Sequence, residues 1–233
     1  MPEKTKFQST DIGGLLGRGL NDVEKKYAPK TLYYKGAMQL PIRHARVSIV
    51  GTRNPTETGI SNAKKVAKAL VKERVAIVSG LARGIDAVGH RTAIEEGGET
   101  IAVLGTPLNK TSPSQNTDLQ KEIMDRHLAI SQYPDGHTTR GKDFVLRNFT
   151  MALISDASVI AEAGDGGGTL HHGREALRLG RPLFICQSVF QNEELKWPGE
   201  FMRQGAVKLV DLEQIFEFTS PNVPPSDLRQ HMS

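Results

Sequence analysis

The chain has 233 residues, of which 38% are hydrophobic and 24% charged, as expected for a globular protein with a substantial core. Its single cysteine, Cys186, excludes an internal disulfide, and no apolar run approaches the ~18 residues that a membrane span requires. The formal net charge of +4 lies in residues 1–45, which hold eight Lys and Arg against four Asp and Glu. The remaining residues are balanced, so a polyanion site there must be a local patch. Without a recognisable signal peptide, the expected compartment is the cytoplasm.

Residues 1–45 are expected to form an N-terminal arm and edge extension. The first 30 residues contain few apolar anchors, which favours a weakly ordered arm with one short helix around residues 20–27. An extended piece is expected at residues 32–36. We expect the main domain to span residues 46–220, and the proline-containing residues 221–233 to form a disordered tail.

From residue 46 onward, short apolar runs alternate with amphipathic stretches. Strands are expected at residues 47–50, 75–78, 100–104, 128–131, 159–163, 182–186 and 207–210. Helices are expected at residues 60–74, 86–96, 117–126, 144–154, 169–179 and 193–203, with Asp86 and Asn116 as candidate N-caps. This alternation predicts an α/β fold, namely a Rossmann-like, doubly wound, mostly parallel sheet with a short N-terminal extension.

Three of the expected strands end in glycine-rich loops: Gly51-Thr52-Arg53, Ser79–Gly84 and Gly164–Thr169. In an open parallel sheet, ligands bind at the carboxyl ends of the strands, where glycines let backbone amides approach phosphates. The first two loops carry Arg53 and Arg83, and a guanidinium can bind a phosphate through two hydrogen bonds. The loops therefore predict a ligand that carries phosphate.

A fourth segment, residues 140–149, combines cations, aromatic rings and an amide. Single-stranded nucleic acid is bound by this mixture, because cations contact phosphates and an aromatic ring stacks on a base. The candidate residues are Arg140, Lys142, Phe144, Arg147 and Asn148. Phe149 is expected to be a core anchor of the helix, and for Phe144 both interpretations stay open.

Other chemistries have little support in the sequence. The third loop does not match the dinucleotide spacing G-x-G-x-x-G, because Thr169 stands at the third glycine, and no Walker-type Gly-Lys-Ser/Thr motif is present. Side chains at His171 and His172 would point about 100° apart on a helix, which disfavours a shared metal ion. We therefore expect no cofactor and no metal.

In order and spacing, several segments between residues 32 and 188 resemble the DNA-processing protein A (DprA/Smf) family. The segments are Leu32–Gly36, Ile49–Arg53, Ser79–Asp86, His90 with Ala93, Gly97–Gly105, Ser114–Leu119, Ser131–Gly136, Phe144–Asn148, Glu162-Ala163 and Gly180–Pro182.

This resemblance implies a Rossmann-like domain that binds single-stranded DNA without catalysis and forms homodimers. It also implies a partner, a RecA-type recombinase, which such proteins load on incoming DNA during transformation. Arg53 and Lys142 would bind phosphates. The positions that match the family's DNA pocket are Gly51, Thr52, Arg53, Ser79, Gly80, Arg83, Gly84, Asn116, Lys142, Phe144, Arg147 and Asn148.

The chain departs from the family's usual pattern at Gln132, Phe149, Gly166–Thr169 and Cys186–Ser188, and it shows no segment similar to the winged-helix domain of many members. A divergent member with a role in another DNA-handling pathway therefore stays open.

Two alternatives also stay open. Gly166–Thr169 with Glu175 faintly resembles the signature of the lonely-guy phosphoribohydrolases, which cleave nucleoside monophosphates. Here the glutamate follows the threonine by six residues rather than three, which turns it away from the ligand on a helix. The third possibility is a sensor that binds a small nucleotide in the same pocket.

Overall fold

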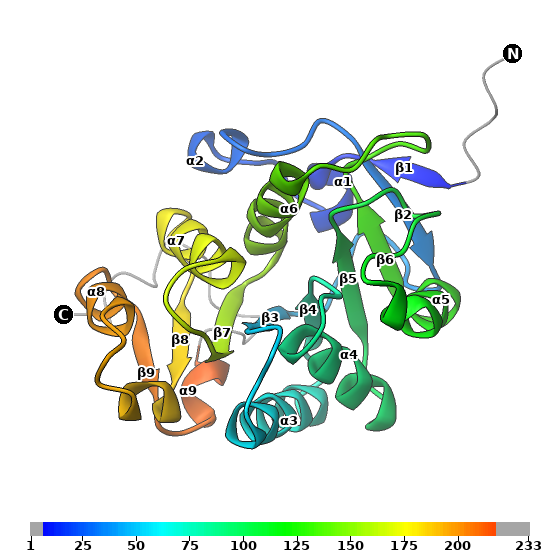
Figure 1. Ribbon diagram of the computed structural model, residues 1–233. Coiled ribbons are helices and arrows are strands. Elements are labelled where there is room, and N and C mark those ends of the chain that lie inside the picture. Colours follow the sequence, from blue (N-terminus) through cyan, green and yellow to red (C-terminus); the bar gives the residue numbers. More distant parts are fainter. Residues whose placement is uncertain (1–6, 218–233) are drawn as a thin grey trace, which may run out of the picture.

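A computed structural model describes residues 7–217 (Figure 1). Within this range one sheet has the strand order β1-β2-β6-β5-β4-β3-β7-β8-β9, and its neighbours are parallel except at β1–β2 and β2–β6. The strands are β1 (Gln8–Thr10), β2 (Leu32–Gly36), β3 (Arg46–Gly51), β4 (Ala76–Ser79), β5 (Thr100–Leu104), β6 (Leu128–Ser131), β7 (Ala157–Glu162), β8 (Leu183–Cys186) and β9 (Val207–Leu209). The predicted Rossmann-like, mostly parallel sheet is confirmed.

Helices cover both faces of this sheet. They are α1 (Ile12–Leu16), α2 (Asp22–Lys25), α3 (Glu57–Lys72), α4 (Ile85–Glu95), α5 (Thr117–Arg126), α6 (Gly141–Ile154), α7 (Gly168–Arg178), α8 (Trp197–Arg203) and α9 (Glu213–Phe216). In Figure 1, α6 and α7 lie on one side of the row of strands, and α3 and α4 lie on the other. Strand residues alternate between these layers: Val78 packs toward the α6 side and Ile77 toward the α3 side.

The strand order places β3 at the switch point of the sheet. The chain adds β4, β5 and β6 on one side of β3, and it then crosses over to add β7, β8 and β9 on the other side. The loops that follow β3 and β7 therefore begin side by side. The first leads to strands on one side of the sheet, and the second leads to strands on the other side. In open α/β sheets, ligands bind outside the carboxyl ends of the strands at this point.

The expectation of a weakly ordered N-terminal arm differs from the structure. Residues 7–36 add β1 and β2 to the sheet, and Ile12 and Leu15 are fully buried in the core. The Glu24 carboxylate, also buried, pairs with Arg18 at 2.6 Å and with Arg181 at 2.8 Å. The two buried apolar residues and the long-range ion pair with Arg181 hold this segment on the domain, although few apolar residues occur in it. The tail expected at residues 221–233 lies outside the described residues.

Two further differences lie near the C-terminal end of the described range. The helix expected at residues 193–203 begins only at Trp197, because the Asn192 side chain accepts the backbone N–H of Glu194 at 3.1 Å and closes a turn there. Helix α9 was not expected from the sequence. No helix among residues 7–217 combines the length and the apolar character that a bilayer crossing needs.

Candidate functional site

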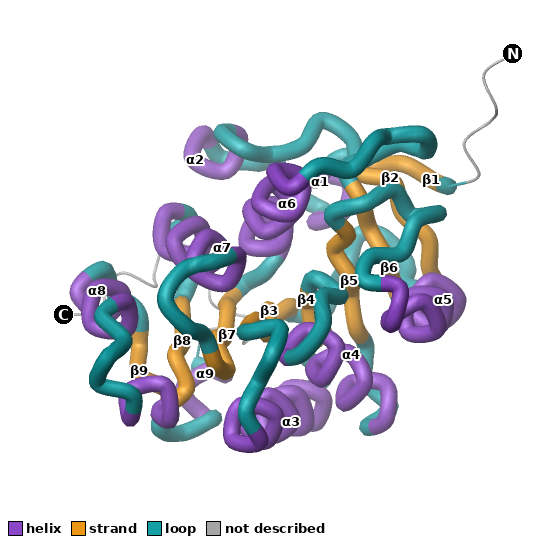
Figure 2. The backbone as a smooth tube through the Cα atoms, viewed as in Figure 1, coloured by secondary structure: helices purple, strands orange, loops and turns teal. Residues whose placement is uncertain are grey.

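A pocket of about 700 Å³ lies at the switch point, where the loops after β3, β4 and β7 meet one face of α6. Figure 2 shows the loops after β3 and β7 next to each other, and the N–H of Thr52 donates to the carbonyl oxygen of Glu162 at 2.8 Å. Among the described residues, the charged side chains that line the pocket are Arg53, Arg83, Arg147 and Asp86. The pocket is therefore electropositive and suits an anion.

The first loop forms one wall of the pocket with Gly51, Thr52 and Arg53. A Cβ at Gly51 would come within 2.5 Å of the Ile85 side chain and within 2.7 Å of the carbonyl oxygen of Glu162. Only glycine fits this close crossing of β3, β7 and α4. Arg53 is exposed, so its guanidinium is free to reach a phosphate in solution.

The second loop is held in a strained shape. Leu81 is fully buried and has a φ of +60°, a backbone conformation that residues other than glycine rarely adopt. The buried Asn116 amide donates to the carbonyl oxygens of Leu81 at 2.9 Å and Ala82 at 3.2 Å. Asn116 therefore fixes this loop and does not cap α5 through its side chain. The same loop presents the exposed Arg83 to the pocket.

Three residues of the second loop, predicted as ligand contacts, do not line the pocket. The Ser79 hydroxyl is buried and donates to the carbonyl oxygen of Ile49 at 2.7 Å. Gly80 lies beneath the guanidinium of Arg147. Gly84 has a φ of +75° and crosses the backbone of the first loop, where a Cβ would collide with the Thr52 carbonyl oxygen. Their role is to let the two loops and α6 pack closely.

Arg147 and Asp86 are two buried residues of opposite charge type that both line the pocket. Arg147 donates from Nη1 to the carbonyl oxygen of Val103 at 3.0 Å, and Asp86 accepts the N–H of Ala82 at 3.2 Å. Burial raises the pKa of the Asp86 carboxyl, and the charge of Arg147 opposes that shift. Asp86 is not the cap of α4, because Gly84 occupies that position and the carboxylate points back to the loop.

Helix α6 supplies the aromatic and amide groups of the pocket. Phe144 is half-buried and lines the pocket, and its ring lies so close to Gly105 that a Cβ there would be 2.6 Å from Cδ1. The Asn148 amide donates to the carbonyl oxygen of Gly168 at 3.0 Å. Phe149 faces away from the pocket and packs its ring against Tyr27, with ring centroids 4.9 Å apart.

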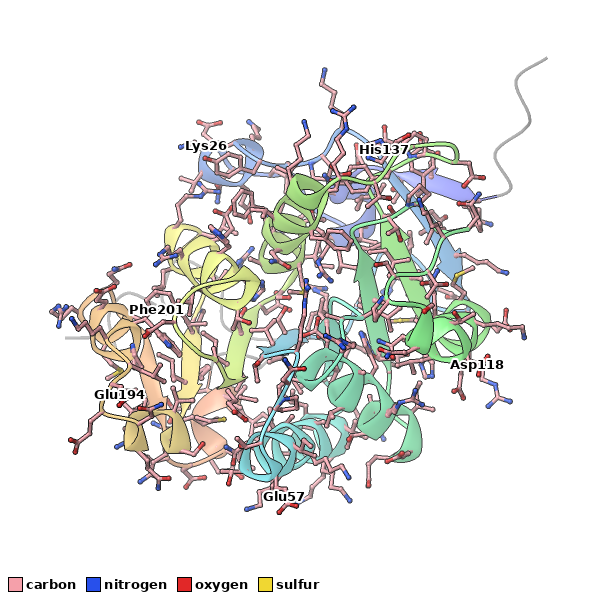
Figure 3. All side chains as sticks on the ribbon, viewed as in Figure 1. Lys26, Glu57, Asp118, His137, Glu194 and Phe201 are labelled. Carbon is pink, nitrogen blue, oxygen red and sulfur yellow. The ribbon has the colours of Figure 1, made fainter. Side chains whose placement is uncertain are left out.

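The N-terminus of α6 carries the exposed cations Arg140 and Lys142 on either side of Gly141, which lines the pocket. The buried Asp143 carboxylate fixes this end of the helix, because it accepts the N–H of Arg140 and contacts His137 Nε2, each at 2.7 Å. Burial alone would raise the pKa of Asp143, but these hydrogen bonds hold it below its ordinary value. Figure 3 labels His137 in the loop that leads into α6.

The third loop, one of the three glycine-rich loops for which the sequence predicts a ligand that carries phosphate, forms another wall of the pocket. Gly166 and Gly167 have φ values of +97° and +85°, and α7 begins at Gly168 without a side-chain cap. The Thr169 hydroxyl donates to the carbonyl oxygen of Gly51 at 3.0 Å and so joins the first and third loops. The third loop shares one pocket with the first loop because β3 and β7 are adjacent in the sheet, which chain order alone does not reveal.

His172 lies beneath this wall. Its ring contacts Ser158 Oγ at 2.9 Å and the carbonyl oxygen of Asn148 at 3.3 Å, and burial lowers its pKa to about 4. His172 is therefore neutral at physiological pH and acts as a structural residue. Within residues 7–217, no cluster of three or more His, Cys, Asp or Glu side chains is placed to bind a metal ion.

The family model of DNA recombination-mediator protein A matches residues 18–220. The chain belongs to this family. Two curated family members are the DNA processing protein DprA of Streptococcus pneumoniae, 38% identical over 157 residues, and the protein Smf of a Synechocystis species, 39% identical over 163 residues. Each comparison covers 67% of this chain but only 55% and 40% of those relatives, so the chain spans about half of their length.

Solved structures of family members share the fold. The X-ray structure of DprA from S. pneumoniae matches 92% of this chain and 75% of its own, with a TM-score of 0.78 and 30% identity. A structure of DprA from Helicobacter pylori, which concerns the single-stranded DNA binding mode of that protein, matches 92% of this chain and 97% of its own, with a TM-score of 0.76 and 25% identity. The resemblance seen in the motifs is confirmed.

Proposed function

We propose that this chain binds single-stranded DNA in the pocket at the switch point, without sequence preference. The observation that carries the proposal is the composition of the pocket, in which Arg53, Arg83 and Arg147 surround a recess flanked by the half-buried ring of Phe144. Cations and an exposed aromatic face are the two groups by which proteins bind single strands irrespective of sequence.

Phosphates would be bound first at the mouth of the pocket. Arg53 stands at the end of β3 and Lys142 in the first turn of α6, and both are exposed. A strand that passes between them would exchange its condensed counterions for two protein cations, so binding weakens as salt rises. Asp143 and His137 support this arrangement because they fix the helix turn that carries Lys142.

The ring of Phe144 would then stack on a base. The ring packs closely on Gly105, and the residue still lines the pocket. Bases of a duplex are stacked on each other and do not offer their faces to a side chain, whereas an unpaired base does. The pocket therefore favours a single strand over a duplex.

Membership of the family suggests what this chain does once a DNA strand is bound. Its members are recombination mediators, and we propose that this chain, as a cytoplasmic homodimer, presents the bound strand to a RecA-type recombinase during DNA uptake. The family match and the charged pocket support this proposal together; the pocket alone would serve any single-strand binding protein.

The position of Glu175 argues against the alternative function, a nucleoside-monophosphate phosphoribohydrolase. Glu175 is buried and does not line the pocket, and its two carboxylate oxygens accept hydrogen bonds from Arg178 at 2.6 and 2.7 Å. We expect no release of free base from AMP. Turnover that disappears in Glu175→Gln would restore the hydrolase hypothesis.

The proposal is tested by fluorescence anisotropy with labelled oligo-dT and with a duplex of equal length, across a salt series. We expect the single strand to bind more tightly, with a logarithmic salt slope of about 0.7 for each phosphate contact. Equal affinity for strand and duplex, or affinity that does not change with salt, would contradict the proposal.

A further inference from the structure

We infer that a second pocket, beside the one at the switch point, binds a base of the DNA strand and that Glu162 makes guanine the preferred base there. The inference deepens the proposed function and rests on it, because the strand that brings this base is the one whose phosphates contact Arg53. The first pocket contacts phosphates and the face of a base, which every nucleotide has, so the preference arises in the second pocket alone.

The second pocket has a volume of about 480 Å³, within the roughly 300–1,000 Å³ of pockets that bind small organic groups. It is lined by the start of α3 and by residues that follow β8, which lie beside each other in Figure 1, and Asn62 of α3 donates to Ser188 Oγ at 2.7 Å. Three residues line both pockets, namely Thr52, Ala163 and Gly164. Because Arg53 follows Thr52 directly, a strand bound at Arg53 passes both pockets.

The second pocket differs from the first in its charge. Within residues 7–217, Glu162 is the only charged side chain that lines it, whereas three arginines line the first pocket. Its other polar side chains include the hydroxyls and amides of Thr58, Ser188, Gln191 and Asn192. Val189 and Leu195 add apolar surface. A phosphate is repelled by Glu162 and meets no cation here, so the second pocket suits a neutral, partly apolar group such as a base.

The Glu162 carboxylate is held in place in this second pocket. Its Oε2 atom accepts the N–H and the hydroxyl of Thr56, each at 3.0 Å, whereas Oε1 has only a 3.3 Å contact with that N–H. Gly59 packs against the carboxylate so closely that a Cβ at residue 59 would collide with Oε2. Each carboxylate oxygen has two lone pairs, so Oε1 keeps the capacity to accept a hydrogen bond from a ligand.

Only the bases within a DNA strand carry hydrogen-bond donors, because phosphodiesters have acceptors alone and deoxyribose lacks the 2′-OH of RNA. A carboxylate beside the strand therefore weakens binding unless it accepts a hydrogen bond from a base. Guanine matches Glu162 best, since its N1–H and N2 amino group are adjacent donors. Thymine matches it worst, since its one donor, N3–H, lies between two carbonyl oxygens that the carboxylate repels.

Anisotropy with three labelled strands of equal length tests the inference: alternating dT and dG, alternating dT and deoxyinosine, and dT alone. Inosine is a purine that lacks the N2 amino group, so it stacks on Phe144 as guanine does but offers Glu162 one donor fewer. We expect the dG strand to bind about fivefold more tightly than the dT strand, at the low end of what one base contact contributes, with the inosine strand between them. The ratio should not change with salt, because this contact releases no counterions.

Glu162→Gln locates the contact. It keeps an acceptor for Thr56 but removes a negative charge beside the strand, so it should bind dT at least as tightly as the original chain and lose the preference for dG. Glu57→Gln is the matched control, because Glu57 is an exposed residue of α3 that lines neither pocket and is labelled in Figure 3; it should keep the preference. If Glu162→Gln does not fold, Thr58→Met narrows the second pocket from an exposed position and should also remove the preference.

The outcomes separate the two proposals. Equal affinity for the dG and inosine strands would overturn the guanine site and leave single-strand binding intact. A preference for dG that survives in Glu162→Gln would place guanine elsewhere and also overturn the inference. If no strand binds, the proposed function fails, and saturation-transfer NMR with free deoxyguanosine and thymidine decides the second pocket by itself. A deoxyguanosine signal that is stronger than that of thymidine and disappears in Glu162→Gln would support it, and equal or absent signals would overturn it.

Discussion

The guanidinium of Arg147 lies directly over the Cα of Gly80, so closely that a Cβ at residue 80 would collide with Nη1 of the arginine. This contact joins the loop after β4 to α6. It also explains why a glycine stands at the end of a strand where ligand contact was expected: the glycine makes room for a cation that itself lines the pocket.

Gly80→Ala should therefore impair binding through Arg147. The new methyl group has to displace a buried guanidinium and also approaches the Asp86 carboxylate, which would be 2.7 Å away. We expect a loss of about 1–3 kcal/mol in the free energy of unfolding from overpacking, and weaker oligo-dT binding. Urea denaturation and anisotropy measure the two effects.

Gly89→Ala is the control for that variant. Gly89 is also buried, but it lies within α4, and a Cβ there would meet its nearest neighbour at an ordinary 3.6 Å. We expect unchanged binding and equal or greater stability, since alanine restricts the unfolded chain. If the two variants bind DNA equally well, the contact between Gly80 and Arg147 does not matter for the site.

Phe144 provides the test of base stacking. Phe144→Leu removes the aromatic face, and we expect single-strand binding to fall by about 1–3 kcal/mol, the usual contribution of one stacked base. Phe144→Tyr keeps the face and should bind nearly as the original chain does. Anisotropy under identical salt conditions compares the three proteins. Equal weakening in both variants would mean that packing on Gly105, rather than stacking, controls the affinity.

Two buried histidines predict how stability depends on pH. Burial lowers the pKa of His90 to about 3 and that of His172 to about 4. In the unfolded chain a histidine has a pKa of about 6.5, so below this pH the unfolded state binds protons that the folded state does not. The free energy of unfolding should therefore fall as the pH drops below about 6.5, by up to about 1.4 kcal/mol per pH unit for each histidine.

His172→Gln tests this dependence by urea denaturation at several pH values between neutral and about pH 4. The variant should be less stable at neutral pH, because Ser158 and the Asn148 carbonyl lose a ring partner, but its stability should fall less steeply with acid. His171→Gln alters an exposed neighbour and should keep the original slope. Identical slopes in all three proteins would show that His172 does not resist protonation.

Periodicity predicted most of the fold because the parallel strands are short apolar runs and the crossover helices are amphipathic. For example, the bounds predicted from the sequence for the strands Thr100–Leu104 and Leu128–Ser131 are the bounds seen in the structure. In the N-terminal arm, the short helix and the extended piece at residues 32–36 were predicted correctly, but the order of the first 30 residues was underestimated because only a few of them, such as Ile12 and Leu15, are core residues. The ion pair of Glu24 with Arg181 depends on tertiary structure and leaves no local pattern.

The site was predictable in outline and less so in detail. Glycine at the strand ends indicated where the pocket forms, and arginines in those loops indicated its charge. Which side chains face the pocket depends on packing: Ser79 turns to the Ile49 carbonyl, and Asn116 turns to the second loop. The third loop was expected to contact a ligand, but it shares one pocket with the first loop because β7 lies beside β3, and long-range strand order is not encoded in local sequence.

The central claim is that the cations at the mouth of this pocket bind the phosphates of a single strand. Its most direct test compares Arg53→Ala/Lys142→Ala with Lys64→Ala/Lys65→Ala, which removes two exposed lysines from α3, in anisotropy with oligo-dT across a salt series. We predict that only the first pair weakens binding and lowers the salt slope, by about 1.4 for two phosphate contacts. Unchanged affinity and slope in Arg53→Ala/Lys142→Ala would contradict the account.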